Sequence, residues 1–145
     1  MAEKENIQFA EQAIDALNAR DLDRYLQRLD DSYVGESELA PGPIRGPQAA
    51  RQMLETQLKA FPDLRIEIEQ MIASGDQVVV RARVSGTHKG SLLGIAPTNK
   101  SVSWRACNIV ELRNGKVIRS RIYADNASLF EQLGALSLAR AKAAV

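Results

Sequence analysis

Four stretches of this chain alternate so regularly in side-chain character that they predict one β-sheet with two unlike faces. Even-numbered positions are almost all apolar, whereas odd-numbered positions carry the charged residues. Successive side chains on a strand point to opposite faces, so the parity of a residue number assigns the residue to a face. A binding pocket is expected on the apolar, inner face. The stretches are Leu64–Ile68, Val78–Val84, Val102–Leu112 and Val117–Ala124.

A few polar groups, those of Asn108, Ser120 and Trp104, interrupt the inner face and are candidates for binding a ligand. A buried carboxamide without a partner costs about 1–3 kcal/mol, so Asn108 in the middle of this face needs a hydrogen-bond partner. That partner is either a ligand carbonyl or hydroxyl, or else Tyr25, Tyr33 or ordered water. The indole of Trp104 either walls the pocket or belongs to the core. The candidate substrate-binding residues are Asn108, Trp104, Tyr33, Ile122 and Ser120.

The charged outer face is expected to be solvated or to contact a second copy of the chain. Cys107 also has outward parity, and as the single cysteine it is interpreted as a half-buried structural thiol. At the start of the last strand, parity directs Ile118 inward. The charged residues directed outward are Arg65, Glu67, Glu69, Arg81, Arg83, Arg105, Glu111, Arg119 and Arg121.

The first half of the chain predicts three helices and a short strand. Apolar residues recur at three- and four-residue spacing over 3–18, which is typical of an amphipathic helix. Asp21 is a candidate N-cap for a short second helix. A third helix is expected to start at Pro47 and to stop near Pro62. The apolar residues of the second helix are expected to be Leu22, Leu26 and Leu29.

The remaining segments predict how these elements are connected. A short strand is expected at 32–34, and the proline density of 40–47 excludes regular structure there. Tight hairpin turns are expected at 74–76 and at 113–116, the second of which contains Asn-Gly. A final short helix over 125–133 ends before a glycine, and residues 135–145 either extend it or fray. The result is an α+β fold with helices on one side of a curved sheet.

Composition excludes several classes of function. With 45% hydrophobic and 26% charged residues, the 145 residues fit one globular domain, 1–145. A net charge of +1 gives no indication of a basic surface that would bind nucleic acid or an anionic membrane. The start of the chain lacks the apolar core of a secretory signal, so a cytoplasmic location is expected. One histidine and one cysteine predict no metal site, and no cofactor is expected.

Six motifs run through the second half of the chain: Phe61-Pro62-Asp63, Gly86-Thr87-His88-Lys89-Gly90, Leu93–Lys100, Asn114-Gly115-Lys116-Val117, Asp125 and Gln132-Leu133-Gly134. Together they resemble the SnoaL-like polyketide cyclases of the nuclear transport factor 2-like superfamily. The similarity covers nearly the whole chain. It implies a cone-shaped domain with three N-terminal helices on the concave face of a mainly antiparallel sheet, a deep pocket between them, and usually a homodimer.

The chain departs from these cyclases at two positions. In cyclase members, an acid/base aspartate stands three positions before the aspartate matched by Asp125, and a histidine stands at the position of Asn108. The first position is Ile122 here, and isoleucine cannot accept or return a proton. The remaining candidate catalytic residues are His88, expected near the pocket mouth, and Asp125, which alternatively caps the last helix.

Three functions are compatible with these observations. The first is a cyclase or isomerase that acts by acid/base chemistry on a small apolar carbonyl compound. The second is a non-catalytic domain that binds a hydrophobic ligand in the same pocket. The third is an epoxide-opening hydrolase, which requires carboxylates and an arginine inside the pocket, whereas parity directs the strand arginines outward.

Overall fold

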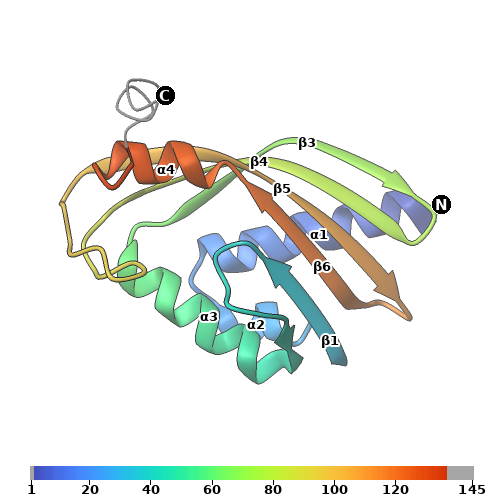
Figure 1. Cartoon of the computed structure of the whole chain (residues 1–145). Coiled ribbons are helices and arrows are strands. Elements are labelled where there is room, and N and C mark those ends of the chain that lie inside the picture. The colour runs from blue at the N-terminus through green and yellow to red at the C-terminus, as the bar shows by residue number, and fades with distance from the viewer. Residues whose placement is uncertain (1, 137–145) are drawn as a thin grey trace.

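The computed structural model describes residues 2–136, which form a curved six-stranded sheet with helices packed against it (Figure 1). The strand order is β2-β1-β6-β5-β4-β3; β1 runs parallel to β6, and the other neighbouring pairs are antiparallel. The expected α+β class is confirmed. The elements are α1 (Ala2–Asn18), α2 (Leu22–Leu26), β1 (Leu29–Ser37), β2 (Ile44–Arg45), α3 (Gly46–Ala60), β3 (Arg65–Ser74), β4 (Gln77–Thr87), β5 (Ser101–Arg113), β6 (Lys116–Ala124) and α4 (Asn126–Gln132).

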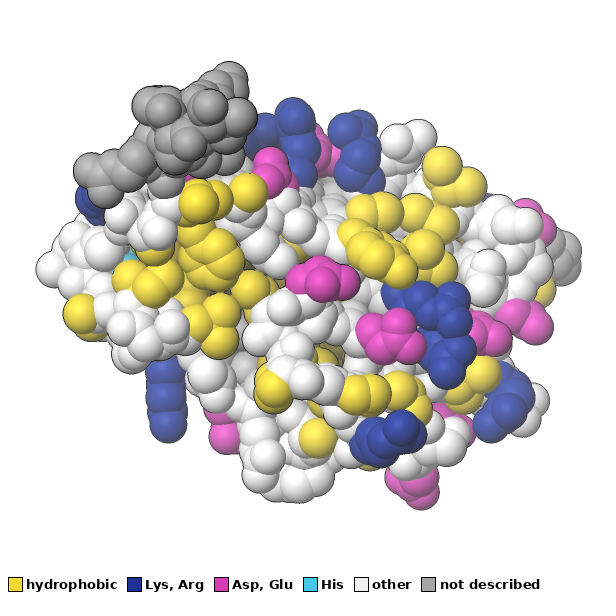
Figure 2. All heavy atoms as spheres, in the orientation of Figure 1, with side chains coloured by type: hydrophobic (Ala, Val, Ile, Leu, Met, Phe, Trp, Pro, Cys, Tyr) yellow, Lys and Arg dark blue, Asp and Glu magenta, His cyan; other side chains and the backbone are white. Residues whose placement is uncertain are grey.

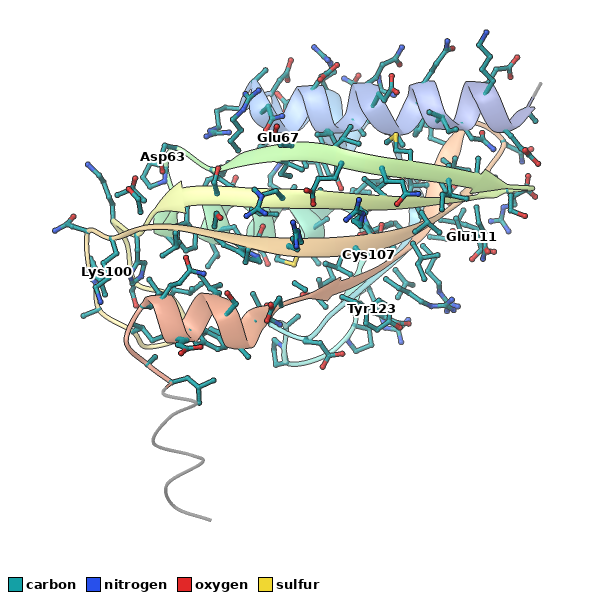
Figure 3. The ribbon with its side chains drawn as sticks, turned by 90° about the horizontal axis from the view of Figure 1, so that it is seen from above. Asp63, Glu67, Lys100, Cys107, Glu111 and Tyr123 are labelled. Carbon is teal, nitrogen blue, oxygen red and sulfur yellow. The ribbon has the colours of Figure 1, made fainter. Side chains whose placement is uncertain are left out.

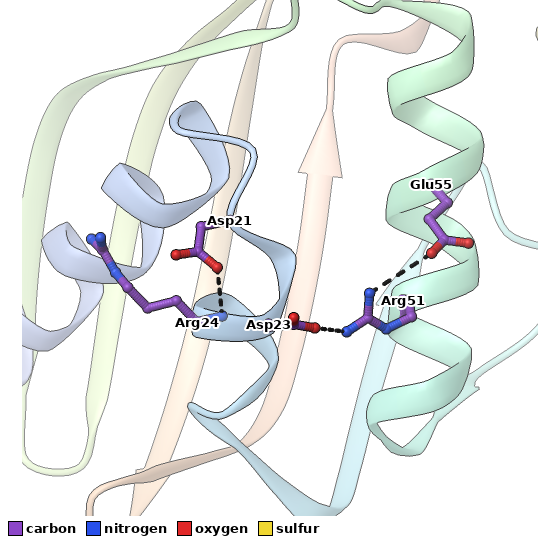
Figure 4. Close-up of polar contacts among 5 residues, drawn as sticks. All are labelled: Asp21, Asp23, Arg24, Arg51 and Glu55. Atoms are coloured by element: carbon purple, nitrogen blue, oxygen red, sulfur yellow. Dashed lines mark hydrogen bonds and ion pairs between the residues drawn. The ribbon is translucent and has the colours of Figure 1, made fainter.

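Polar contacts fix the short helix α2 beside α3 (Figure 4). Asp21 caps α2 as expected, because its Oδ1 accepts a hydrogen bond from the Arg24 backbone N–H at 3.0 Å. Asp23 of α2 forms an ion pair with Arg51 of α3. Arg51 also approaches Glu55, one turn further along α3, at 3.8 Å. These contacts hold α2 in place, so that its opposite side faces the interior.

Three details of the first half differ from the prediction. Leu29 belongs to β1 and not to α2. β1 is longer than the expected strand at 32–34 because it pairs with β6 on one side and β2 on the other. The proline-rich segment contains β2, in which Ile44 pairs with Gly35. Proline removes a backbone donor only at its own position, so the two residues after Pro43 are free to pair at the sheet edge.

The hairpin turns lie where the sequence predicts them. The Asn-Gly turn at 114–115 has φ angles of 52° and 72°, as a type I′ turn requires. Directly after it, the pairing register shifts between Glu111 and Leu112. This bulge reverses the parity of the first residues of β6, so Val117 is buried and occupies the inward place expected for Ile118.

The chain after β6 forms α4 as expected. Asp125 is its N-cap, because Oδ1 accepts a hydrogen bond from the Ser128 backbone N–H at 3.1 Å. Gly134 follows the helix with a φ of 80°. Residues 135–136 do not extend α4, and the rest of the expected tail lies outside the described residues. Within residues 2–136, the structure contains no helix with the length and apolar character that a membrane crossing requires.

The hydrophobic core is divided into two clusters at opposite ends of the inner face. The first core cluster lies at the end of β5 and the start of β6, and the second lies at the start of β5 under α4. Most domains of this size have one contiguous core. The buried residues are Ala10, Leu29, Tyr33, Ile44, Ala50, Val78, Val80, Val110, Leu112 and Val117 in the first cluster, and Ala60, Phe61, Leu92, Val102, Trp104, Leu129 and Leu133 in the second.

Candidate functional site

A cavity of about 210 Å³ is lined by residues of both core clusters. Its walls come from the inner face of the sheet and from all four helices, and they are predominantly apolar. Apolar side chains also reach the molecular surface between α4 and α3 (Figure 2), two elements that contribute to the lining. A concave, mostly apolar cavity with a few polar groups is the usual form of a small-molecule site.

The floor of the cavity is a row of three alanines on adjacent strands. Ala82 of β4 pairs with Ala106 of β5, and Ala106 pairs with Ala124 of β6. All three line the cavity, and their small side chains leave the space above the floor open. The neighbouring rows hold larger side chains, namely Val84 and Trp104 toward the second core cluster and Val80, Asn108 and Ile122 toward the first.

The structure brings together all five predicted substrate-binding residues, since each of them lines the cavity. Trp104 and Tyr33 are 9% and 3% exposed, and Ser120 is buried as well. Whether they touch a ligand stays a prediction. The five are Asn108, Trp104, Tyr33, Ile122 and Ser120.

Asn108 is the polar group at the centre of the inner face. It pairs with Val80 on one side and with Ile122 on the other, so both cross-strand neighbours are apolar. Its Oδ1 is buried, and no described residue supplies a hydrogen bond to it. Neither Tyr25 nor Tyr33 is therefore the partner considered from the sequence. A carboxamide can present either its oxygen or its nitrogen after a 180° turn, so Asn108 can bind a ligand donor or a ligand acceptor.

Two tyrosines bring phenol groups to the cavity from different elements. Tyr25 comes from α2 and Tyr33 from β1. Burial raises the pKa of the Tyr25 phenol, and the nearby Tyr33 adds to the shift. Burial also raises the pKa of Tyr33, although the Ser120 hydroxyl opposes the change. Both phenols therefore stay protonated at neutral pH and can donate hydrogen bonds.

Parity did not identify several further polar residues of the lining, and two of these, Arg28 and Asn126, carry buried atoms without a partner within residues 2–136. Arg28 lies between α2 and β1, and Asn126 opens α4, so neither belongs to a strand. The Arg28 Nε and the Asn126 Oδ1 are buried, and neither has a hydrogen-bond partner among the described residues. An asparagine directly after an N-cap aspartate could have been recognised as lying near the pocket, because the cap itself is adjacent to the last strand.

Among residues 2–136, no side chain of the cavity lining serves as a base at neutral pH. Within residues 2–136, its ionisable groups are the phenols of Tyr25 and Tyr33 and the guanidinium groups of Arg20 and Arg28. Arg20 is already bound to the Pro62 carbonyl oxygen at 3.0 Å. The same residues also include no group of three or more metal-ligating side chains. The lining can therefore donate hydrogen bonds, but it offers no carboxylate or imidazole to accept a proton.

His88 is fully buried and is not among the residues that line the cavity, in contrast to its expected place at the mouth. Its Nδ1 accepts a hydrogen bond from the Thr98 backbone N–H at 3.2 Å, and its backbone pairs with Lys100 across the base of the connection between β4 and β5. Its ring packs against Phe61, which does line the cavity, with centroids 5.6 Å apart. The connection folds back onto the end of α3, and this encloses the imidazole.

Asp125 is exposed and does not line the cavity. Its carboxylate is engaged in capping α4 through Ser128, as described above. The geometry thus supports the alternative considered from the sequence, in which Asp125 caps the last helix. Neither His88 nor Asp125 has direct access to a ligand in the cavity, so neither is placed to transfer a proton to it.

The outer face carries the charged residues that parity directed there. Glu67 on β3 and Cys107 and Glu111 on β5 lie on this face (Figure 3). The ion pairs Arg105–Glu69, at 3.3 Å, and Arg121–Glu36, at 3.8 Å, link neighbouring segments of the face. Cys107 is half-buried, as expected. None of the strand arginines lines the cavity; the arginines that do so, Arg20 and Arg28, come from segments outside the strands.

The fold and the cavity define a class of small α+β domains in which helices close one face of a curved sheet around a ligand-sized space. The chain belongs to the SnoaL-like polyketide cyclase family, whose model matches residues 7–133. A curated relative, the aklanonic acid methyl ester cyclase AcmA of Streptomyces galilaeus, is 24% identical over 131 residues, which are 90% of this chain and 91% of the relative. The nogalonic acid methyl ester cyclase of Streptomyces nogalater is 26% identical over 115 residues, 79% of this chain and 84% of that one.

A solved structure shows the same fold. AclR of Streptomyces galilaeus superimposes with a TM-score of 0.84 at 28% identity, covering 93% of this chain and 99% of AclR. The expected membership of the family and the expected fold are thus confirmed.

The two positions at which this chain departs from the cyclase pattern are direct neighbours in space. Asn108 of β5 and Ile122 of β6 are register partners, and both line the cavity. A histidine and an aspartate at these positions would face the same ligand from adjacent strands. Here the pair consists of a carboxamide and a hydrocarbon, and neither side chain transfers protons at neutral pH.

Proposed function

We propose that this protein binds a small, predominantly apolar molecule carrying a carbonyl or hydroxyl oxygen, and that it does so without an acid/base pair of its own. The observation that carries the proposal is the cavity lining, which is apolar, contains hydrogen-bonding groups and has no carboxylate or imidazole within residues 2–136. Ligands of this kind gain affinity from apolar burial and orientation from a few polar contacts.

Asn108 supports the proposal that the ligand carries a carbonyl or hydroxyl oxygen. Its buried, unpartnered Oδ1 lies between the apolar cross-strand neighbours Val80 and Ile122, and a ligand that pairs with this carboxamide removes the cost of leaving it unsatisfied. A hydrocarbon of the same shape leaves that cost in place. The protein is therefore expected to prefer an oxygenated ring to the matching hydrocarbon.

A second candidate function is cyclisation or isomerisation of the bound carbonyl compound. Family membership and the two curated relatives, both cyclases, favour it. In this chain the protein contribution would be hydrogen-bond donation to the carbonyl, since the described residues of the lining supply no base. The epoxide-hydrolase alternative loses support because it requires carboxylates in the cavity.

Paired ligands test the proposal. 1-Tetralone and tetralin share a ring skeleton and differ by one carbonyl oxygen. Thermal-shift titrations with both compounds therefore measure how much the oxygen contributes to binding affinity. Emission from Trp104, the single tryptophan, reports whether the ligand occupies the cavity. We expect wild type to bind 1-tetralone more tightly than tetralin and Asn108→Leu to lose most of that preference. Equal affinities in wild type would refute the proposal.

Turnover separates the two candidates. Exchange of the hydrogens next to the carbonyl of 1-tetralone in D₂O, followed by NMR, measures enolisation. A wild-type rate equal to that in buffer supports binding alone, and a rate above it supports the cyclase or isomerase candidate.

A homodimer and a cytoplasmic location are further proposals. The two signs of charge on the outer face support the dimer, because such a surface can pair with a second copy of itself. A monomer in analytical ultracentrifugation would refute it.

A further inference from the structure

One end of the cavity gathers hydrogen-bond donors from four segments of the chain. Tyr25 comes from α2, Arg28 from the segment after it, and Tyr33 from β1, and the Ser120 hydroxyl of β6 joins them. Tyr33 belongs to the first core cluster, Tyr25 packs against that cluster, and Arg28 stacks on Phe9, which packs there too. We call Tyr25, Arg28, Tyr33 and Ser120 the donor corner.

The backbone of β1 sets the position of the Tyr33 hydroxyl. Tyr33 and Gly35 lie two residues apart on the same face, and a Cβ at Gly35 would stand 2.6 Å from the Tyr33 Oη. The phenol therefore lies against the backbone at Gly35, an approach that only glycine permits. Gly35 pairs with Ser120, so the hydroxyl groups of Tyr33 and Ser120 lie in the same part of the cavity wall. Donors held in this way need no rearrangement when a ligand binds.

Arg28 gives the corner a positive charge that the described residues do not neutralise. Its guanidinium donates to the Gln12 Oε1 at 3.0 Å and to the Phe9 carbonyl oxygen at 3.4 Å, and both acceptors are uncharged. Its Nε is buried without a partner, and the salt bridges within residues 2–136 do not involve it. Burial lowers the pKa of Arg28, the direction expected for a cation without a paired anion.

We propose that the donor corner binds a ligand oxygen that carries negative charge, such as the enolate or phenolate oxygen of the molecule described under the proposed function. The inference rests on that function and adds to it the protonation state of the bound ligand. Two phenols and a guanidinium line this end of the cavity, whereas the lining within residues 2–136 includes no carboxylate that would repel a negatively charged oxygen. The ligand class is thus an apolar, weakly acidic carbonyl or phenol compound.

The sign of a pKa change in a bound probe tests this inference. The probe is 6-cyano-2-naphthol, whose neutral and anionic forms differ in absorbance, and 2-methoxynaphthalene serves as the matched ligand that cannot ionise. Burial in an apolar cavity alone disfavours the anion and moves the midpoint of the bound naphthol to higher pH. Hydrogen bonds from the donor corner favour the anion and move the midpoint of the bound naphthol to lower pH. We expect the midpoint of the bound naphthol to lie at least one pH unit below that of the free compound, a tenfold or greater preference for the anion.

Substitutions in the donor corner test which residues lower the midpoint of the bound naphthol. Tyr33→Phe and Arg28→Gln are each expected to reduce the preference for the anion by at least about threefold, while binding of 2-methoxynaphthalene shows that the cavity remains folded. Tyr123→Phe is the matched control, because Tyr123 is 53% exposed and does not line the cavity; it should behave as wild type. Asn108→Leu should keep the shifted midpoint, because Asn108 does not belong to the donor corner.

The possible failures are distinguishable. A raised or unchanged midpoint in wild type that still binds 2-methoxynaphthalene would overturn the donor corner and leave the proposed function standing. A lowered midpoint that persists unchanged in both Tyr33→Phe and Arg28→Gln would also overturn it. Absence of binding by both naphthalenes, together with absence of 1-tetralone binding, would overturn the proposed function itself.

Discussion

Enlarging the central alanine of the cavity floor distinguishes a functional space from a fully packed interior. Ala106→Val adds two carbon atoms to a side chain that lines the cavity. At about 0.8 kcal/mol for each buried methylene, the upper value of the added stability is about 1.6 kcal/mol. For a chain of 145 residues, that corresponds to a rise in Tm of roughly 3–6 °C. The added carbons occupy ligand space, so affinity for 1-tetralone should fall about tenfold or more.

The same substitution in the packed core is the control. Ala60 is fully buried in the second core cluster, and its carbonyl oxygen accepts hydrogen bonds from the backbone N–H groups of Lys89 and Gly90. Overpacking costs about 1–3 kcal/mol, so Ala60→Val should lower Tm by several degrees. Thermal unfolding of the three proteins, with and without 1-tetralone, measures both effects. Equal losses of Tm in both variants would refute the claim that the space above Ala106 is open. Unchanged binding of 1-tetralone by Ala106→Val would also refute it.

Three other perturbations probe separate parts of the site. The double substitution Asn108→His and Ile122→Asp installs an acid/base pair on adjacent strands, and exchange next to the carbonyl of 1-tetralone in D₂O should then exceed the wild-type rate by about 10²–10⁴-fold; no gain would show that the pair does not reach the ligand. Burial raises the pKa values of Tyr25 and Tyr33 above 10.0, so the neutral phenols contribute stability that is present below pH 10.0 and is lost as the pH rises through the folded values. Urea unfolding should therefore show a steeper alkaline loss in wild type than in Tyr25→Phe or Tyr33→Phe, and equal slopes would contradict the burial argument. Gly35→Ala should destabilise the protein by about 1–3 kcal/mol because its methyl group meets the Tyr33 hydroxyl, and a double-mutant cycle with Tyr33→Phe should recover most of the loss; strict additivity would exclude that contact.

The inner face of the sheet was predictable because strand geometry converts residue parity into direction without knowledge of the rest of the fold. Four of the five predicted binding residues, Trp104, Asn108, Ser120 and Ile122, reached the cavity for this reason, whereas Tyr33 lies outside the four alternating stretches. Parity failed at the start of β6, where a one-residue bulge exchanged Val117 for Ile118. A bulge changes the count of residues along one strand only, and hydrophobicity is nearly equal at these two positions, so the sequence held no signal for it.

Residues outside the strands were beyond the reach of parity. Arg28 and Asn126 line the cavity because tertiary contacts direct the ends of α2 and α4 toward it. His88 was misplaced for a related reason. Its burial depends on the connection between β4 and β5 folding onto the end of α3, where a Cβ at Gly90 would stand 2.2 Å from the Lys59 carbonyl oxygen. Such long-range contacts have no local sequence period.

The division of the core bears on whether the cavity serves a function. Cavities enclosed by apolar side chains cost about 24 cal/mol per Å³, so the upper value for 210 Å³ is on the order of 5 kcal/mol relative to a filled interior. Domains are stable by only about 5–15 kcal/mol in total. Valine at one or two positions of the alanine row would recover part of this loss with no change of fold, because the row lies on regular, paired strands. A chain selected for stability alone would fill the space, so the small side chains at Ala82, Ala106 and Ala124 argue that the open volume itself is what the fold maintains.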